Sequence, residues 1–183
     1  PTKPELDADA GDAFSSLATQ LRAGGRLDDP TLSNNRIGET VITLPPGKTT
    51  VTELGAMMSG VTSDGRRVRG LHIKGAGQEI SEVVFNPTFP GFLFENLDIF
   101  SRITIENVTF TGGSANAKFM NSASNGGPQS NRFFNVKWRG AWGRLFDLSG
   151  SDTNSEFVWF ACTAIGTIGK IVCCNNVQAL NHT

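Results

Sequence analysis

The sequence is poor in the residues that build disulfide frameworks and metal centres. It has three cysteines, Cys162, Cys173 and Cys174, and two histidines, His72 and His182, which lie far apart in the chain. Adjacent cysteines do not bridge easily, so a disulfide framework is excluded. The cysteines could be small core residues or metal ligands. Metal binding has little support, because the two histidines lie far apart in the chain. We therefore expect no metal and no cofactor.

Long apolar runs and an excess of one charge are also missing. No run approaches the roughly 20 apolar residues that cross a bilayer, so we expect no membrane insertion. Residues 1–11 are polar and lack the apolar region of a signal peptide, which predicts either assembly inside a cell or a leader already removed. The formal net charge of −1 gives no electrostatic footprint for nucleic acid or an anionic membrane.

Sustained helical periodicity is absent from most of the chain, and a longer repeat takes its place. The segment around Asn107 recurs around Asn135, and Ala161 has the same place in a third copy. The step is roughly 27 residues, and a period of about 20 to 50 residues is typical of a solenoid. A second segment recurs at the same interval, and its aligned basic residues are Lys118, Arg144 and Lys170.

The content of each repeat favours strands. Short runs of Val, Ile, Phe and Thr alternate with Gly, Asn and Ser, which mark corners. Successive turns of such a solenoid stack as parallel strands about 4.8 Å apart and bury columns of like side chains. The predicted inward columns are Val108 with Val136 and Cys162, Phe110 with Trp138 and Ala164, and Ile105 with Phe133 and Trp159.

The chain before the repeats divides into an arm, a helix and a first turn. Residues 1–11 predict a flexible N-terminal arm. Apolar residues at helical spacing predict a helix from Asp12 to Ala23, which caps the first turn. We expect residues 12–183 to be the N-terminal part of one domain that continues beyond Thr183. In its first turn, which carries an insertion relative to the later ones, we expect Ile73 to lie under Phe110.

Three segments then suggest a family. Val41–Gly47 (VITLPPG), Leu71–Gly77 (LHIKGAG) and Ile103–Phe110 (ITIENVTF) follow the predicted helix in that order. This order resembles the start of pectin-lyase-like right-handed parallel β-helices, above all the phage tailspike and tail-fibre members. Over residues 12–176, the resemblance implies an all-β fold, a right-handed parallel β-helix (solenoid) with an N-terminal capping α-helix. It also implies a homotrimer in the complete protein.

The function classes follow from that resemblance. The first is a virion protein of the phage tail that binds, and in a catalytic form depolymerises, a host cell-surface polysaccharide as a glycoside hydrolase or lyase. The second is a structural or adaptor virion protein that uses the solenoid as a rigid rod among other virion proteins. A secreted polysaccharide lyase or hydrolase is third, because the calcium-binding carboxylates and paired aspartates of those enzymes are missing.

One outward surface is the candidate binding site. Glu106 shares a column with Phe134 and Phe160, and its charge predicts that this column faces solvent. Two exposed rings would form a platform for a sugar ring or a subunit contact. Donors to acidic sugars would come from an adjacent row of side chains and from a following turn: Thr109, Thr163, Lys137, Arg139 and Trp142.

Other polar residues have two interpretations each. Hydrolysis needs two carboxylates about 5 to 10 Å apart, and the catalytic candidates are Asp147, Asp152 and Glu156, with simple solvation as the alternative. The basic column of Lys118, Arg144 and Lys170 is either an anion-binding stripe, or its side chains splay into solvent or pair with acids. The sequon at Asn107 is better explained by corner asparagines that hydrogen-bond along the solenoid.

Overall fold

The structure is a computed structural model that describes residues 40–51, 68–69, 71–87, 91–95, 100–101, 103–121, 130–148, 154–174 and 177–182. All of the secondary-structure elements in these ranges are β-strands, which confirms the all-β class. No helix able to span a membrane occurs in them. The predicted arm and the predicted helix from Asp12 to Ala23 lie outside the described residues.

The described strands pair in parallel throughout, as the stacking prediction requires. The strands are β1 (Thr40–Thr43), β2 (Gly47–Val51), β3 (Val68–Arg69), β4 (Leu71–Lys74), β5 (Ser81–Phe85), β6 (Gly91–Glu95), β7 (Phe100–Ser101), β8 (Thr104–Asn121), β9 (Arg132–Leu148), β10 (Asn154–Phe160), β11 (Thr163–Cys174) and β12 (Val177–His182). Strands β8, β9 and β11 are much longer than the others.

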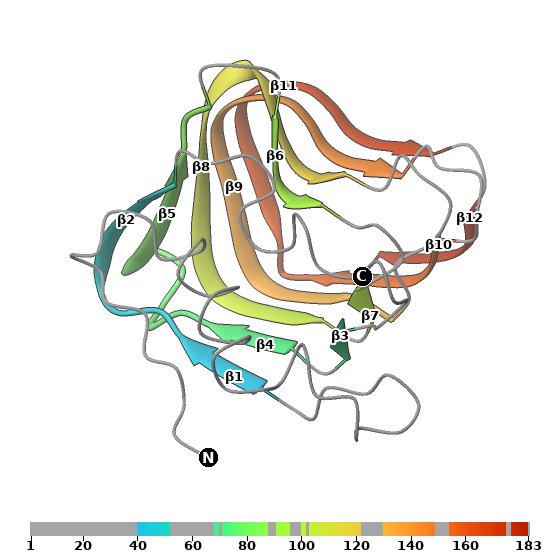
Figure 1. Ribbon diagram of the computed structural model, residues 1–183, viewed down its shortest axis with the longest axis horizontal. Coiled ribbons are helices and arrows are strands. Elements are labelled where there is room, and N and C mark those ends of the chain that lie inside the picture. Colours follow the sequence, from blue (N-terminus) through green and yellow to red (C-terminus); the bar gives the residue numbers. More distant parts are fainter. Residues whose placement is uncertain are drawn as a thin grey trace.

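Strand β8 bends around a shared interior and pairs with three different strands in turn (Figure 1). Its residues 104–106 pair with β4, residues 109–112 with β5, and residues 117–121 with β6. These three parts define three walls. The first wall contains β1, β4, β10 and β12, the second contains β2 and β5, and the third contains β6. Strands β8 and β9 run through all three walls, and β11 continues the second and third.

The register confirms the predicted columns among the repeats. Phe110 pairs with Trp138, and Trp138 pairs with Ala164. On the first wall, Phe133 pairs with both Ile105 and Trp159. The repeat steps predicted from the sequence are therefore the steps between neighbouring parallel strands.

The predicted register of the first turn is wrong. Ile73 pairs with Ile105 on the first wall, and Val83 pairs with Phe110 on the second wall. The chain leaves the first wall at Gly75, whose backbone N–H donates a 2.9 Å hydrogen bond to the carbonyl of Glu106. It then turns and enters β5, so β5 rather than β4 stacks under residues 109–112.

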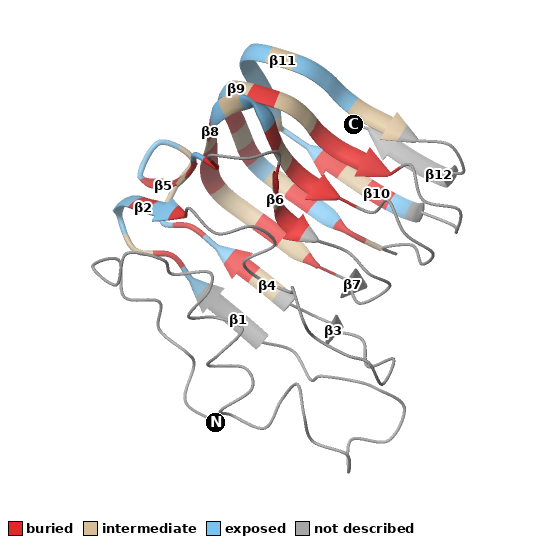
Figure 2. Cartoon of the chain, turned by 45° about the horizontal axis from the view of Figure 1, so that its top comes forward, coloured by how far each residue is buried: buried red, intermediate tan, exposed pale blue. Residues whose placement is uncertain are grey.

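Aromatic side chains fill the interior between the walls. Buried residues follow β8 and β9, whereas β11 is mostly exposed or half-buried (Figure 2). Phe119 is fully buried, and its ring centroid lies 4.7 Å from that of Phe110 and 5.0 Å from that of Phe94. The buried positions of Trp138 and Trp159 confirm that both are core residues.

The predictions that Cys162 and Ala164 face the core hold only in part. Strand β11 pairs with β9 on one side and with no described strand on the other. Ala164 is exposed, although its register partner Trp138 is buried. Cys162 is half-buried and packs against the core, and its Sγ lies 3.4 Å from the carbonyl oxygen of Phe133. A side chain at the edge of a stack is covered on one side only.

Candidate functional site

The outer face of the first wall carries the predicted ring column. The register places Lys74 beside Glu106, Glu106 beside Phe134, and Phe134 beside Phe160. Side chains alternate between the two faces of a strand, so the buried neighbours Ile105 and Phe133 fix this column on the outer face. We call Lys74, Glu106, Phe134 and Phe160 the ring column.

The two rings lie at the surface but do not stack flat. Phe160 is 54% exposed, and Phe134 is half-buried. Their ring centroids are 6.5 Å apart, and their planes are inclined by 59°. The two rings therefore form a stepped rather than a flat apolar surface.

A charged cluster borders this apolar surface. The Oε1 atom of Glu106 lies 3.3 Å from Nζ of Lys74 and 3.3 Å from Nε2 of His72. Nε2 of His72 is buried, and although Glu106 Oε1 is close enough, the two are not aligned for a hydrogen bond, so this nitrogen has no hydrogen-bond partner within the described chain. The cluster therefore offers acceptors on Glu106 and donors on Lys74 directly beside the rings. Sequence reasoning missed His72 and Lys74, because the expected register put β4 against the wrong part of β8.

Two of the predicted donors on the second wall, Arg139 and Lys137, are engaged by acids, whereas Thr163 is exposed and Thr109 is buried rather than outward as expected. Arg139 Nη2 lies 2.6 Å from Glu82 Oε1, and Arg139 Nε donates to Thr111 Oγ1 at 2.9 Å. Thr111 Oγ1 in turn donates to the same Glu82 oxygen at 2.7 Å. Lys137 pairs with Glu79, and Thr109, which is buried, donates to the carbonyl of Gln78.

These contacts lower the pKa of Glu82. Burial by itself raises the pKa, but the hydrogen bonds from Thr111 and Arg139 and the charges of Arg139 and Lys48 outweigh it. The second wall therefore holds a tight ion-pair network. Its acids, Glu79 and Glu82, were not considered in the sequence interpretation because β5 was not recognised as a strand.

The catalytic candidates lie apart. Asp147 is buried near the end of β9 on the third wall, and its Oδ2 lies 2.8 Å from Lys118 Nζ and 2.6 Å from Arg144 Nη1. Glu156 is exposed in β10 on the first wall and accepts a hydrogen bond from Ser130 Oγ. Asp152 lies outside the described residues. The Asp147 contacts match the prediction that the basic column pairs with acids.

Trp142 occupies a different place from the one expected. It lies within β9 rather than on a turn, and it is almost fully buried. Its Nε1 donates a 2.8 Å hydrogen bond to the carbonyl of Arg139, and its ring centroid lies 6.3 Å from that of Phe85. The indole is therefore part of the core, and it offers no surface to a ligand.

The cysteines and histidines of the described chain do not assemble. No group of three or more His, Cys, Asp or Glu side chains able to hold a metal ion occurs in the described ranges. Burial raises the pKa of the Cys162 thiol, although backbone hydrogen bonds oppose that effect. The ring column, with its charged border, is thus the best-formed candidate surface. No protein-family model, curated protein or solved structure matches this chain.

Proposed function

We propose that this chain belongs to a right-handed parallel β-helix in a phage tailspike-type virion protein. The ring column on its first wall would bind a host cell-surface polysaccharide. The fold part of the proposal is supported by the parallel strands, the three walls and the regular repeat step. The complete protein would be a homotrimer of the phage tail.

The exposed ring of Phe160 carries the proposal. Phe160 lies on the outer face of the sheet, so its ring does not contribute to the core, and 54% of its surface is exposed to solvent. The neighbouring ring of Phe134 extends the apolar surface along the stack. A pyranose can place its apolar face on such rings while its hydroxyl groups bond to Glu106 and Lys74.

Binding is better supported than cleavage. Hydrolysis by a carboxylate pair needs the two groups about 5 to 10 Å apart, but Asp147 and Glu156 lie on different walls. Asp147 is also held by two cations in a buried ion pair. In a depolymerase of this kind, the acid pair would be other than Asp147 with Glu156.

A rigid structural role is the second candidate. Ion pairs and hydrogen bonds join strands along the outer walls: Arg139 of β9 reaches across β8 to Glu82 of β5, and Asn135 bonds to Asn107 on the neighbouring strand. Bonds of this kind stiffen a solenoid whether or not it touches sugar. A secreted polysaccharide lyase or hydrolase has no comparable observation in its favour.

The proposal is tested with the full-length protein and purified capsule or lipopolysaccharide from candidate hosts. Equilibrium binding and release of oligosaccharides are measured on the same samples. We expect saturable binding to at least one polysaccharide. Release of oligosaccharides would assign the catalytic alternative, and a protein that assembles into virions but binds no surface polysaccharide would overturn the proposal in favour of the structural role.

A further inference from the structure

A second polar surface lies on the third wall, away from the ring column. The register pairs Lys118 with Arg144 and Arg144 with Lys170. Neighbouring parallel strands lie about 4.8 Å apart, so three cationic side chains follow one another on one face. Like charges at this spacing repel by roughly 1 kcal/mol in water, and the repulsion disfavours the column unless anions compensate it.

The described acids compensate the column only in part. The single carboxylate oxygen Asp147 Oδ2 contacts both Lys118 and Arg144. Lys170 is exposed, and none of the ion pairs found among the described residues includes it. Among the described ion pairs, one carboxylate therefore faces a column of three cations, and the column carries more positive charge than Asp147 neutralises.

Part of the cationic surface remains accessible to a ligand. The side chain of Arg144 is 37% exposed and that of Lys118 is 29% exposed. Asp147 Oδ2 accepts a 2.6 Å hydrogen bond from Nη1 of Arg144, and a guanidinium carries five N–H donors in all. A guanidinium that reaches solvent in this way can act as a bidentate donor to oxyanions.

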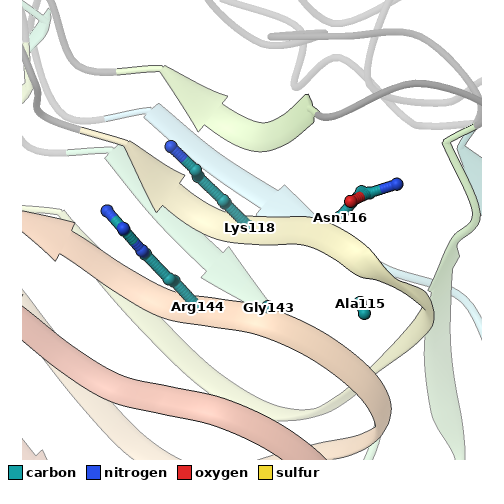
Figure 3. Close-up of a pocket in the computed structure, with 5 residues that line it drawn as sticks. All are labelled: Ala115, Asn116, Lys118, Gly143 and Arg144. Carbon is teal, nitrogen blue, oxygen red and sulfur yellow. The ribbon is translucent and has the colours of Figure 1, made fainter.

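A hollow of about 260 Å³ lies directly beside these cations. It is lined by Ala115, Asn116, Lys118, Gly143 and Arg144. Lys118 and Arg144 extend in the same direction from adjacent strands, and Gly143 presents no side chain (Figure 3). A Cβ at position 143 would lie 2.1 Å from the carbonyl oxygen of Ala115, so the backbone packing keeps this position a glycine.

We propose that this surface binds an oxyanion, held by Arg144, Lys118 and Lys170. The ligand group is a phosphate, a sulfate or the carboxylate of an acidic sugar. The oxyanion supplies the negative charge that Asp147 alone does not supply, and the hollow gives it room beside the guanidinium edge. The inference rests on the proposed function only where the anion comes from a polysaccharide.

The test is calorimetric titration with inorganic phosphate at constant ionic strength, using the whole chain. We expect saturable binding that weakens about threefold to fivefold in Lys170→Gln, the size expected for one charge at this distance in water. Lys48→Gln on the second wall is the matched control, because Lys48 is an exposed lysine of the same length, and it should leave affinity unchanged. Asp147→Asn removes the competing carboxylate and should tighten phosphate binding.

Lys170→Gln is the decisive variant, since Lys170 has no described partner and its loss should not affect folding. Phosphate binding that is absent, or that changes equally in Lys170→Gln and Lys48→Gln, overturns the inference. A parallel titration compares a tetrasaccharide that carries glucuronate with neutral maltotetraose. Selective binding of the acidic tetrasaccharide identifies a sugar carboxylate as the ligand, and phosphate binding alone identifies the free anion. The Phe160→Ala variant reports binding at the ring column separately, because Phe160 is not part of the cationic surface.

Discussion

Asn135 Nδ2 donates a 2.8 Å hydrogen bond to Asn107 Oδ1 on the neighbouring strand. Both asparagines have the left-handed backbone conformation, with φ of 52° and 56°. Asparagine adopts this conformation more readily than other non-glycine residues. The corner between the first and second walls is therefore specified by a side chain that both accepts the backbone geometry and bonds along the stack.

Ala161 occupies the same corner one step further, with φ of 52° and no side-chain group to continue the ladder. We expect Ala161→Asn to raise the free energy of unfolding by about 1 kcal/mol, from relieved backbone strain and a bond to Asn135. Denaturant unfolding measures the change. Ala161→Val should destabilise instead, and an Ala161→Asn variant no more stable than the wild type would refute this explanation of the corner.

Gly140 combines a positive φ of 85° with a close approach of backbone, since an added Cβ would lie 2.4 Å from the Gly112 carbonyl oxygen. Gly140→Ala should therefore lower the free energy of unfolding by more than the roughly 1 to 3 kcal/mol expected from dihedral strain alone. Gly47 is the matched control, because its φ is 105° but no atom lies within 4 Å of an added Cβ. Thermal unfolding should show a clearly larger loss for Gly140→Ala than for Gly47→Ala, and equal losses would contradict the packing argument.

Phe119 is the centre of the aromatic core. Its ring centroid lies 5.3 Å from that of Trp138 and 5.5 Å from that of Phe146, in addition to its contacts with Phe94 and Phe110. We expect Phe119→Ala to lower the free energy of unfolding by about 3 to 5 kcal/mol. The exposed Phe160→Ala should change it by about 0.5 kcal/mol or less. Similar losses in the two variants would mean that the interior is packed differently.

Glu82 makes stability depend on acidity. Its pKa is lowered in the folded protein from the usual value of 4.5, because bonds and charges from Thr111, Arg139 and Lys48 outweigh burial. Its contribution is therefore fully present above the unfolded pKa and is lost as pH falls through the folded pKa. Melting temperatures between pH 3 and 7 should fall less steeply in Glu82→Gln than in the wild type.

Thr111→Val removes one of the bonds to Glu82 and should give a smaller change in the same direction. If the pH dependence of the Glu82→Gln variant matched that of the wild type, the network would not be the source of the acid sensitivity.

The repeats from Thr104 to Cys174 were predictable because like residues recur at a nearly constant step. Phe110 aligned correctly with Trp138, and Lys118 with Arg144, since buried columns select similar shapes and corners select asparagine or glycine. The first turn was not predictable in the same way. Placing Ile73 under Phe110 gave the wrong register, because Ile73 lies on the first wall beside Ile105, whereas Val83 on the second wall is the residue beside Phe110.

The candidate site was predicted in part. The charge of Glu106 correctly indicated that its column faces outward, and Phe160 is exposed as expected. Trp142 was expected on a turn, but it lies within β9, where an added Cβ at Gly140 or Gly143 would meet the backbone of the neighbouring strand. The acids that engage Arg139 and Lys137 come from an earlier turn, and no local pattern in the sequence connects them.

The central claim is that the ring column binds polysaccharide, and affinity in Phe160→Ala tests it most directly. Ile165 is a matched control, because it is 56% exposed on the second wall, where its register partner is Arg139. Calorimetry with the host polysaccharide bound by the full-length protein should show at least a tenfold loss of affinity, about 1.4 kcal/mol, in Phe160→Ala. The affinity of Ile165→Ala should be unchanged. Unchanged affinity in Phe160→Ala, with both variants folded, would contradict the claim.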